Sequence, residues 1–308
     1  MAGAFVAVAD DATATWWNPA GLAGGAYFDA VIESDRLQEP RTETWPAGEP
    51  AAAWRTSTRA FAAAFPSLGL SYYRLRISEI APGLPTATGA AVREDQGTAN
   101  VRLRALVLQQ FGATVGQSIG EHLVVATTLK LVHDSVASDE VAQADASLDR
   151  AETLGGQGET HGDADVGAMA TFGHVRLGLT VRNLRQPGFG EGADRVRLDR
   201  QARAGVSVSG PGRGALGALT VDVDADLTRS ATVLGDERRL AGGVEAWLFG
   251  RRVSVRGGVS GSTIGASRRT TSGGLSLALR SGFYVEGMVV GGNDRARRGW
   301  GADLRVTY

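Results

Sequence analysis

The segment LTVDVDADLT, residues 219–228, decides the fold class of this chain. Its odd positions carry the apolar side chains Leu, Val, Val, Ala and Leu, and its even positions carry only Thr and Asp. Successive side chains of a β-strand point to opposite faces, so this segment predicts a strand with one apolar and one polar face. The last residues, 300–308 (WGADLRVTY), alternate in the same way.

From about residue 25 to the C-terminus the chain contains roughly 14 runs of this kind. The gaps between the runs alternate between short and long. The short gaps are Pro66-Ser67, 117–120, Gly173, 210–214, Gly250-Arg251 and Ser281. The long gaps are roughly 36–55, 80–98, 137–162, 185–199, 229–237, 261–270 and 291–298. Tight turns at one end and longer loops at the other are typical of outer-membrane barrels, so we predict an all-β, transmembrane antiparallel barrel of about 14 strands.

The length of the runs supports a membrane barrel. Most of the clear runs have about 9 to 11 residues, as a tilted membrane-spanning strand needs, whereas strands of soluble proteins average about five or six. The segments 71–78 and 101–115 change phase midway, and we interpret this change as β-bulges. The alternative is a soluble sandwich, which would bury the apolar face and expose the charged one to water.

In a barrel, the polar face of the strands lines the interior. It carries charges of both signs in similar numbers, and opposite charges on neighbouring strands stabilise each other. The residues that we assign to this interior charge network are Arg176, Arg182, Arg203, Asp222, Asp224, Asp226, Arg239, Glu245, Arg256, Glu286, Asp303 and Arg305. We expect them to hold the wall together and fill the interior rather than to form an ion pathway.

The composition excludes several kinds of function. The chain has no Cys, which rules out thiol catalysis, disulfides and Cys-ligated metal sites. Its net charge of −1 gives no sign of a nucleic-acid partner, and its four His residues lack metal-ligand spacing. No run approaches the roughly 18 apolar residues of a membrane-spanning helix. We therefore expect no catalytic residue, no cofactor and no metal.

The start of the chain carries no export signal. Met1 leads directly into Ala2-Gly3-Ala4-Phe5, without the charged and apolar regions of a signal peptide. We therefore hypothesise that Met1 is an internal Met of a longer reading frame, or that the chain was trimmed.

Residues 1–24 do not alternate like the strands. Asp10 and Asp11 lie where a helical turn can open, and the hexapeptide Trp16-Trp17-Asn18-Pro19-Ala20-Gly21 follows. Asn-Pro favours a turn, and the Gly gives the backbone freedom. Two interpretations are open. The Trp pair anchors the segment at the membrane interface, or the segment is a plug folded into the barrel mouth.

The stretch GAFVAVADDATATWWNPAGLAGG, residues 3–25, resembles the N-terminal hatch of the FadL superfamily of outer-membrane barrels. Its part NPAGLA, residues 18–23, is most similar to the PorV/PorQ-type branch. Further similarities are LGLTVRNL (177–184) before PGF (187–189), and RQARAGV (200–206).

This resemblance implies the strand number that the alternation predicts. It also implies two parts, a hatch or plug of residues 1–24 in the lumen and a barrel of residues 25–308. The terminal Tyr308 is similar to the signal by which such barrels are recognised for assembly. The expected location is the bacterial outer membrane, with membrane lipid and the barrel-assembly machinery as partners.

Three functional hypotheses are open, and the first two follow from the resemblance. The PorV/PorQ branch implies a non-catalytic accessory barrel that binds a secretion-system protein during protein export to the cell surface. The wider superfamily implies the alternative, passive transport of hydrophobic small molecules such as fatty acids across the outer membrane. The charged interior argues against a long apolar tunnel. The third hypothesis is a purely structural barrel.

Overall fold

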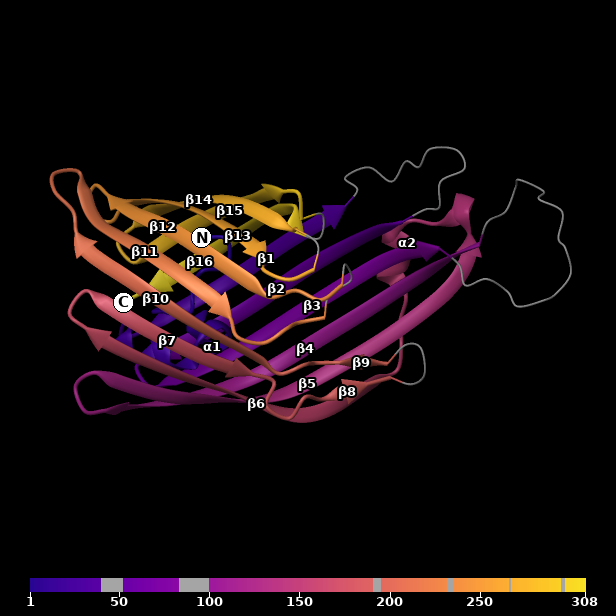
Figure 1. Cartoon of the computed structure of the whole chain (residues 1–308), viewed down its shortest axis with the longest axis horizontal. Coiled ribbons are helices and arrows are strands. Elements are labelled where there is room, and N and C mark those ends of the chain that lie inside the picture. The colour runs from indigo at the N-terminus through magenta and orange to yellow at the C-terminus, as the bar shows by residue number, and fades with distance from the viewer. Residues whose placement is uncertain (40–51, 83–99, 191–194, 232–234, 266, 295–296) are drawn as a thin grey trace, which may run out of the picture.

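Fourteen strands of the computed structural model close into one antiparallel barrel (Figure 1). The structure describes residues 1–39, 52–82, 100–190, 195–231, 235–265, 267–294 and 297–308. The barrel strands are β1 (Asp29–Glu39), β2 (Ala53–Phe65), β3 (Leu68–Pro82), β4 (Asn100–Ile119), β5 (Leu123–Ala142), β6 (Gly158–Phe172), β7 (Val175–Arg182), β10 (Gln201–Pro211), β11 (Leu216–Asp226), β12 (Arg239–Leu248), β13 (Val253–Ser262), β14 (Arg269–Arg280), β15 (Phe283–Gly292) and β16 (Gly299–Thr307).

The remaining elements are short. Two of them, β8 (Gly188–Phe189) and β9 (Val196–Arg197), pair as a separate two-stranded sheet. The helices are α1 (Ala14–Trp17), η1 (Pro19–Gly24), η2 (Gln143–Asp145) and α2 (Leu148–Thr153). None of the helices in the described part of the chain is long and apolar enough to cross a bilayer.

The barrel closes where the first strand meets the last. β1 pairs with β16 from Asp29↔Thr307 to Leu37↔Gly299. Beyond this ladder, the backbone N–H of Phe28 donates to the carbonyl of Tyr308 at 3.1 Å, and the N–H of Tyr308 donates back at 2.9 Å. Closure leaves no sheet edge, as a membrane-spanning sheet requires.

The apolar faces of the strands point outward. On β11, Val221 and Val223 are about half exposed, at 47% and 48%, whereas Asp222 and Asp224 between them are buried. The alternative of a soluble sandwich is therefore wrong, because it would bury these valines against a second sheet. The alternation of 219–228 correctly separates the two faces of the wall.

Several strands are longer than the 9 to 11 residues expected. β4 and β5 have 20 residues each, and β3 and β6 have 15. These strands extend well beyond the rest of the barrel at the long-loop end, where α2 lies (Figure 1). The predicted long gaps at 36–55, 80–98 and 137–162 are correspondingly shorter, because strand pairing continues into them.

The predicted bulges in 71–78 and 101–115 are wrong. β3 pairs with β4 without interruption from Leu68↔Val115 to Pro82↔Val101. The phase of the pattern changes because the outward face itself changes character. Leu70 near the turn is 65% exposed, whereas the outward positions farther along β3 carry Arg74 and Arg76. Register shifts occur instead between Leu216 and Ala218 and between Ala278 and Arg280.

Helix α2 covers the extension of the long strands. Leu148 and Ala151 of α2 are fully buried in one cluster with Ile80 and Leu103. Beside them, the buried Arg55 binds Asp149 at 2.6 Å and Glu152 at 3.4 Å. This hydrogen bond and the charge of Arg55 lower the pKa of the Asp149 carboxyl. The contacts fix α2 on the sheet although a helix of this length is unstable alone.

Replacing Val221 by Arg would test the outward face. We expect the free energy of unfolding from lipid vesicles to fall by about 2–4 kcal/mol, the range for Arg at the middle of a membrane barrel. Urea titration followed by tryptophan fluorescence measures this change. Val221→Leu is the matched control, and we expect it to differ little from wild type. An Arg variant as stable as the Leu variant would contradict lipid contact at Val221.

Candidate binding site inside the barrel

The motif around Asn18 forms a compact turn against the inner wall. Asn18 caps η1, and its side chain accepts a hydrogen bond from the backbone N–H of Ala20 at 3.2 Å. Pro19 follows at the first helical position, where its missing N–H costs nothing. The Asn18 amide also donates to the carbonyls of Val6 at 2.9 Å and Ala168 at 3.2 Å, and so ties the turn to the segment before it and to β6.

Close approach of backbones explains two glycines at this contact. A Cβ on Gly21 would lie 2.0 Å from the carbonyl oxygen of Ala9, and a Cβ on Gly178 of β7 would lie 2.5 Å from that of Val6. Both distances are shorter than real Cβ contacts. Gly178 was not among the predicted site residues. An inward-facing glycine on the polar face of a strand is the signal that could have identified it.

Buried carboxylates of the wall hold the N-terminal backbone. Asp224 accepts hydrogen bonds from the N–H groups of Phe5 at 2.6 Å and Val6 at 2.9 Å. Asp29 accepts from the N–H of Ala12 at 2.9 Å. These bonds supply partners for backbone groups that belong to no sheet, which buried N–H groups require.

Ion pairs connect the two acidic residues of the predicted hatch to the wall. Asp10 lies 3.4 Å from Arg176, and Asp11 lies 3.4 Å from Arg305. Arg305 also binds Asp29 at 2.8 Å. Asp10 and Asp11 therefore contact Arg176 and Arg305, two charges that the sequence analysis assigned to the barrel interior.

The other predicted charges of the wall fall into separate groups. Arg203 binds Asp226 at 2.6 Å, and Arg256 binds Glu286. Glu245 accepts a hydrogen bond from Ser254 at 2.7 Å.

Five of the predicted charges form no ion pair within the described ranges. They are Arg182, Asp222, Asp224, Glu245 and Asp303, and neither carboxylate oxygen of Asp222 has a hydrogen-bond partner there. The network is thus a set of local pairs rather than one continuous chain of contacts.

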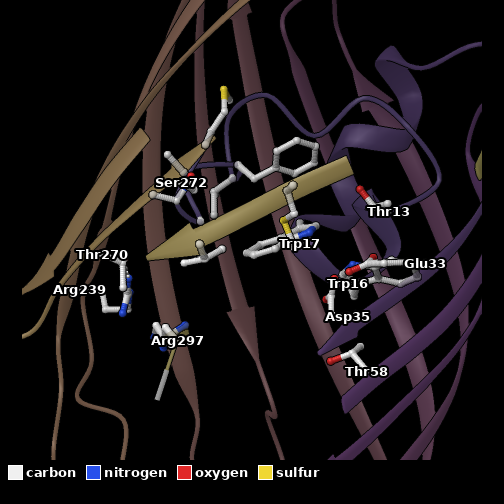
Figure 2. A pocket seen from close by; sticks show the side chains of 18 of the residues that line it. Thr13, Trp16, Trp17, Glu33, Asp35, Thr58, Arg239, Thr270, Ser272 and Arg297 are labelled. Atoms are coloured by element: carbon white, nitrogen blue, oxygen red, sulfur yellow. Dashed lines mark hydrogen bonds between the residues drawn. The ribbon is translucent and has the colours of Figure 1, made fainter. Parts of the chain in front are cut away.

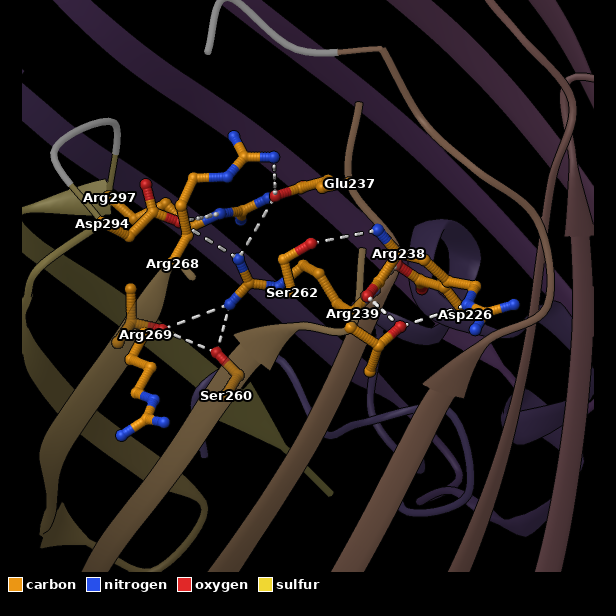
Figure 3. A network of polar contacts seen from close by, with 12 residues as sticks. Asp226, Glu237, Arg238, Arg239, Ser260, Ser262, Arg268, Arg269, Asp294 and Arg297 are labelled. Carbon is orange, nitrogen blue, oxygen red and sulfur yellow. Dashed lines mark hydrogen bonds and ion pairs between the residues drawn. The ribbon is translucent and has the colours of Figure 1, made fainter. Parts of the chain in front are cut away.

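A cluster at the long-loop end was not predicted (Figure 3). Glu237 lies within 2.6 Å of Arg297, 3.5 Å of Arg268 and 3.7 Å of Arg239. Asp294 adds contacts to Arg239 at 3.4 Å and Arg297 at 3.5 Å. Only Arg239 belongs to the alternating pattern of a strand, and the others lie in connections, where alternation gives no information.

Lys130 anchors a second inward-folded segment. Its ammonium lies 2.8 Å from Asp165, 3.2 Å from Asp163 and 3.0 Å from the side-chain oxygen of Asn183, and all four residues are buried. Just beyond Asn183, Phe189 of β8 is buried against the inner wall with Leu108 and Val132. The contacts of Lys130 on β5 with Asp163 and Asp165 on β6 and with Asn183 therefore position the β8–β9 hairpin.

A cavity of about 580 Å³ lies between residues 1–24 and the wall (Figure 2). Its aromatic side is built by Phe5, Trp16 and Trp17, with Tyr73 of β3 facing them. The Phe5 and Trp17 rings lie 5.8 Å apart, and the Trp16 and Tyr73 rings 6.2 Å apart.

Charged residues of both signs form another part of the same lining. Glu33 and Asp35 of β1 and Asp303 of β16 border the cavity together with Arg182. The site can therefore hold an apolar or aromatic group against the rings while polar side chains fix its orientation. Among the described residues no group of three or more His, Asp or Glu side chains is arranged to hold a metal ion.

Replacing Asp224 by Ala would remove the acceptor for two buried N–H groups. An unmade hydrogen bond of this kind costs about 1–3 kcal/mol, so we expect hydrogen exchange at Phe5 and Val6 to become at least about tenfold faster. Exchange measured by mass spectrometry on the folded barrel would show this. Asp236→Ala, in the connection before β12, is the control and should change nothing in residues 1–24. Unchanged exchange in the Asp224 variant would contradict the anchoring.

Solved structures share the architecture. CymD, a monoaromatic hydrocarbon channel, superimposes with a TM-score of 0.61 at 11% identity, over 98% of this chain and 94% of its own. The toluene transporter TbuX of Ralstonia pickettii gives 0.59 at 11%, over 100% and 96%. A Pseudomonas aeruginosa FadL homologue gives 0.55 at 11%, over 99% and 95%. This chain is thus similar to FadL-type outer-membrane barrels, and at these identities the likeness shows the fold alone.

Other comparisons add less. The chain covers 60% of the length of CdiB from Acinetobacter baumannii at a TM-score of 0.43, a likeness too low to carry an argument. No curated protein matches the sequence.

The family comparison covers most of the chain. Residues 15–226, from α1 to the end of β11, match the family described as "F plasmid transfer operon, TraF, protein". This range includes the Asn18 turn and the buried Asp224. The chain therefore belongs to the family described as "F plasmid transfer operon, TraF, protein".

Proposed function

We propose that this chain is a barrel of the bacterial outer membrane whose internal cavity binds small hydrophobic molecules during their passage across the membrane. The observation that carries this proposal is the cavity of about 580 Å³ with an aromatic side built by residues 1–24. Ligand pockets typically have about 300–1,000 Å³ and combine apolar walls with a few polar groups. Trp16, Trp17 and Phe5 provide the apolar part.

The charged side of the cavity limits what can bind. Glu33, Asp35 and Asp303 border the same space, so the site is a pocket with one apolar side rather than a long apolar tunnel. A molecule that lies flat on the indole rings leaves these carboxylates in contact with water, which avoids the cost of burying an unpaired charge. We therefore infer a compact ligand, with an aromatic or short aliphatic body.

We infer that the route for such a ligand follows the barrel axis. β3 pairs with β2 and with β4 along its whole length, so no interruption of pairing on β3 opens a way to the side. A ligand that crosses must pass residues 1–24, which we propose act as the hatch. This extends the division into a hatch of residues 1–24 and a barrel of residues 25–308.

The structural neighbours determine the choice of probe only. CymD is named for monoaromatic hydrocarbons and TbuX for toluene. The description of the TraF family names an operon, which does not say what this barrel binds.

The accessory role in protein export, the PorV/PorQ branch and the assembly signal at Tyr308 stay predictions. Tyr308 is 68% exposed and hydrogen-bonded to Phe28, a geometry that leaves its ring accessible.

Replacing both Trp16 and Trp17 by Ala would remove the aromatic side of the cavity. We expect binding of toluene to weaken by about tenfold or more, because buried aromatic anchors dominate binding sites. Bound radiolabelled toluene is counted in nanodiscs that contain the protein, after subtraction of empty nanodiscs. Palmitate in a parallel assay tests whether a long chain also binds.

The control is Trp300→Ala, which removes a Trp that is half exposed on the outer face. Heat-modifiable migration on a gel shows whether each variant is a folded barrel. Equal toluene binding by wild type and by the folded double variant would refute the proposal, as would a loss of equal size in the Trp300 variant.

A further inference from the structure

The outer face of β1, β2 and β3 changes abruptly from apolar to basic. Ile32, Phe61, Tyr72 and Phe111 lie opposite one another on successive strands and form one outward row. Ile32, Phe61 and Phe111 are 56%, 44% and 55% exposed, as expected for side chains against lipid tails. Toward the long-loop end, the next two outward positions of these strands include arginines.

Three arginines occupy those positions. Arg59 of β2 lies directly opposite Arg74 of β3, and Arg36 of β1 is one outward position farther along. Side chains alternate along a strand, so all three share the outward face with Ile32 and Phe61. We call Arg36, Arg59 and Arg74 the outer arginine patch. Arg76 borders it and donates to the backbone carbonyl of Glu152 in α2.

The barrel strands around the patch supply no counter-charge. The two outward rows across β16, β1, β2, β3, β4 and β5 contain no Asp or Glu in the described register. On α2, Asp149 is bound by Arg55 at 2.6 Å and also interacts electrostatically with Arg36, so it does not face the pair Arg59 and Arg74 alone. No ion pair of Arg36, Arg59 or Arg74 occurs among the residues that the structure describes.

This arrangement costs free energy unless an external anion is present. Like charges directly opposite each other on antiparallel strands repel, and the pair Arg59↔Arg74 is such a contact. The inner face differs from the outer face in this respect. Its arginines Arg203, Arg256 and Arg305 all have carboxylate partners. An anion outside the protein would relieve the repulsion on the outer face.

The position of the patch favours a lipid as the source of this anion. The arginines lie immediately beyond the apolar row, and such a change from apolar to basic side chains suits the step from lipid tails to headgroups. Guanidinium groups bind phosphate in a bidentate geometry, and basic residues beside a membrane span attract anionic lipid. A lipid whose tails lie along Ile32, Phe61 and Phe111 presents its headgroup phosphate to Arg59 and Arg74.

We propose that the outer arginine patch is a binding site for a phosphate-bearing lipid of the leaflet at the long-loop end. In an outer-membrane barrel the long loops face outward, so this is the outer leaflet. The site holds the lipid beside β1, β2 and β3, next to the extension that α2 covers. It is independent of the proposed ligand inside the barrel, which contacts the opposite face of the same strands.

Native mass spectrometry of the full chain, released from detergent, tests the site. Diphosphorylated lipid A is titrated against wild type and against the double variant Arg59→Gln with Arg74→Gln. With roughly 1 kcal/mol for each basic residue at a membrane surface, we expect the variant to bind about tenfold or more weakly. The variant Arg59→Lys with Arg74→Lys keeps the charge but not the bidentate geometry, and we expect intermediate binding.

The matched control removes the same charge at the other end of the barrel. Arg213 and Arg280 are exposed near the turns, and Arg213→Gln with Arg280→Gln should bind the lipid like wild type. Heat-modifiable migration confirms that each variant is folded.

Three results would overturn the proposal. The first is equal affinity of wild type for lipid A and for its dephosphorylated form. The second is an equal loss of binding in the control variant. The third is full displacement of the lipid by inorganic phosphate at the same concentration, which would indicate a general anion site.

Discussion

Pairing of β1 with β16 is the constraint on which the rest of the structure depends. A bilayer offers no hydrogen-bond partner to backbone groups, so a sheet can cross it only when no strand has a free edge. The ladder from Asp29 to Leu37 supplies this closure. It also determines which alternate residues of each strand face the enclosed space. A charge buried on that face is costly unless a partner is available inside the barrel.

Many of these partners are other charges of the wall, such as Asp226 for Arg203, and the N-terminal segment supplies several more. Asp224 accepts two backbone N–H groups of residues 1–24, and Arg305 is shared between Asp11 and Asp29. The segment therefore supplies partners for charges of the wall, while carboxylates of the wall accept hydrogen bonds from the backbone N–H groups of the segment. The space that remains beside it is the cavity at Trp16 and Trp17. The packing of residues 1–24 against the wall thus both fills part of the barrel interior and forms the candidate binding site.

Side chains on the outer surface do not need partners within the protein, because they contact solvent or lipid. Exposed valines and leucines cover the middle of the barrel, whereas the outer arginine patch and α2 lie toward the long loops. The change of phase in 71–78 has its origin here. Leu70 and Arg74 lie on one continuous outward face, which is apolar at Leu70 and basic at Arg74. Alternation of polarity predicts a strand well only while both of its faces keep the same surroundings.

The sequence by itself determined the fold class, the strand number and the position of most turns, because alternation in segments such as 219–228 is a local property of successive residues. It also marked the turn at Asn18, which is stabilised by contacts between neighbouring residues. The tertiary structure alone decided that Asp224 binds Phe5, that Gly178 makes room for Val6, and that Glu237 gathers three arginines. These partners are far apart in the chain, and only the register of a closed barrel brings them within bonding distance.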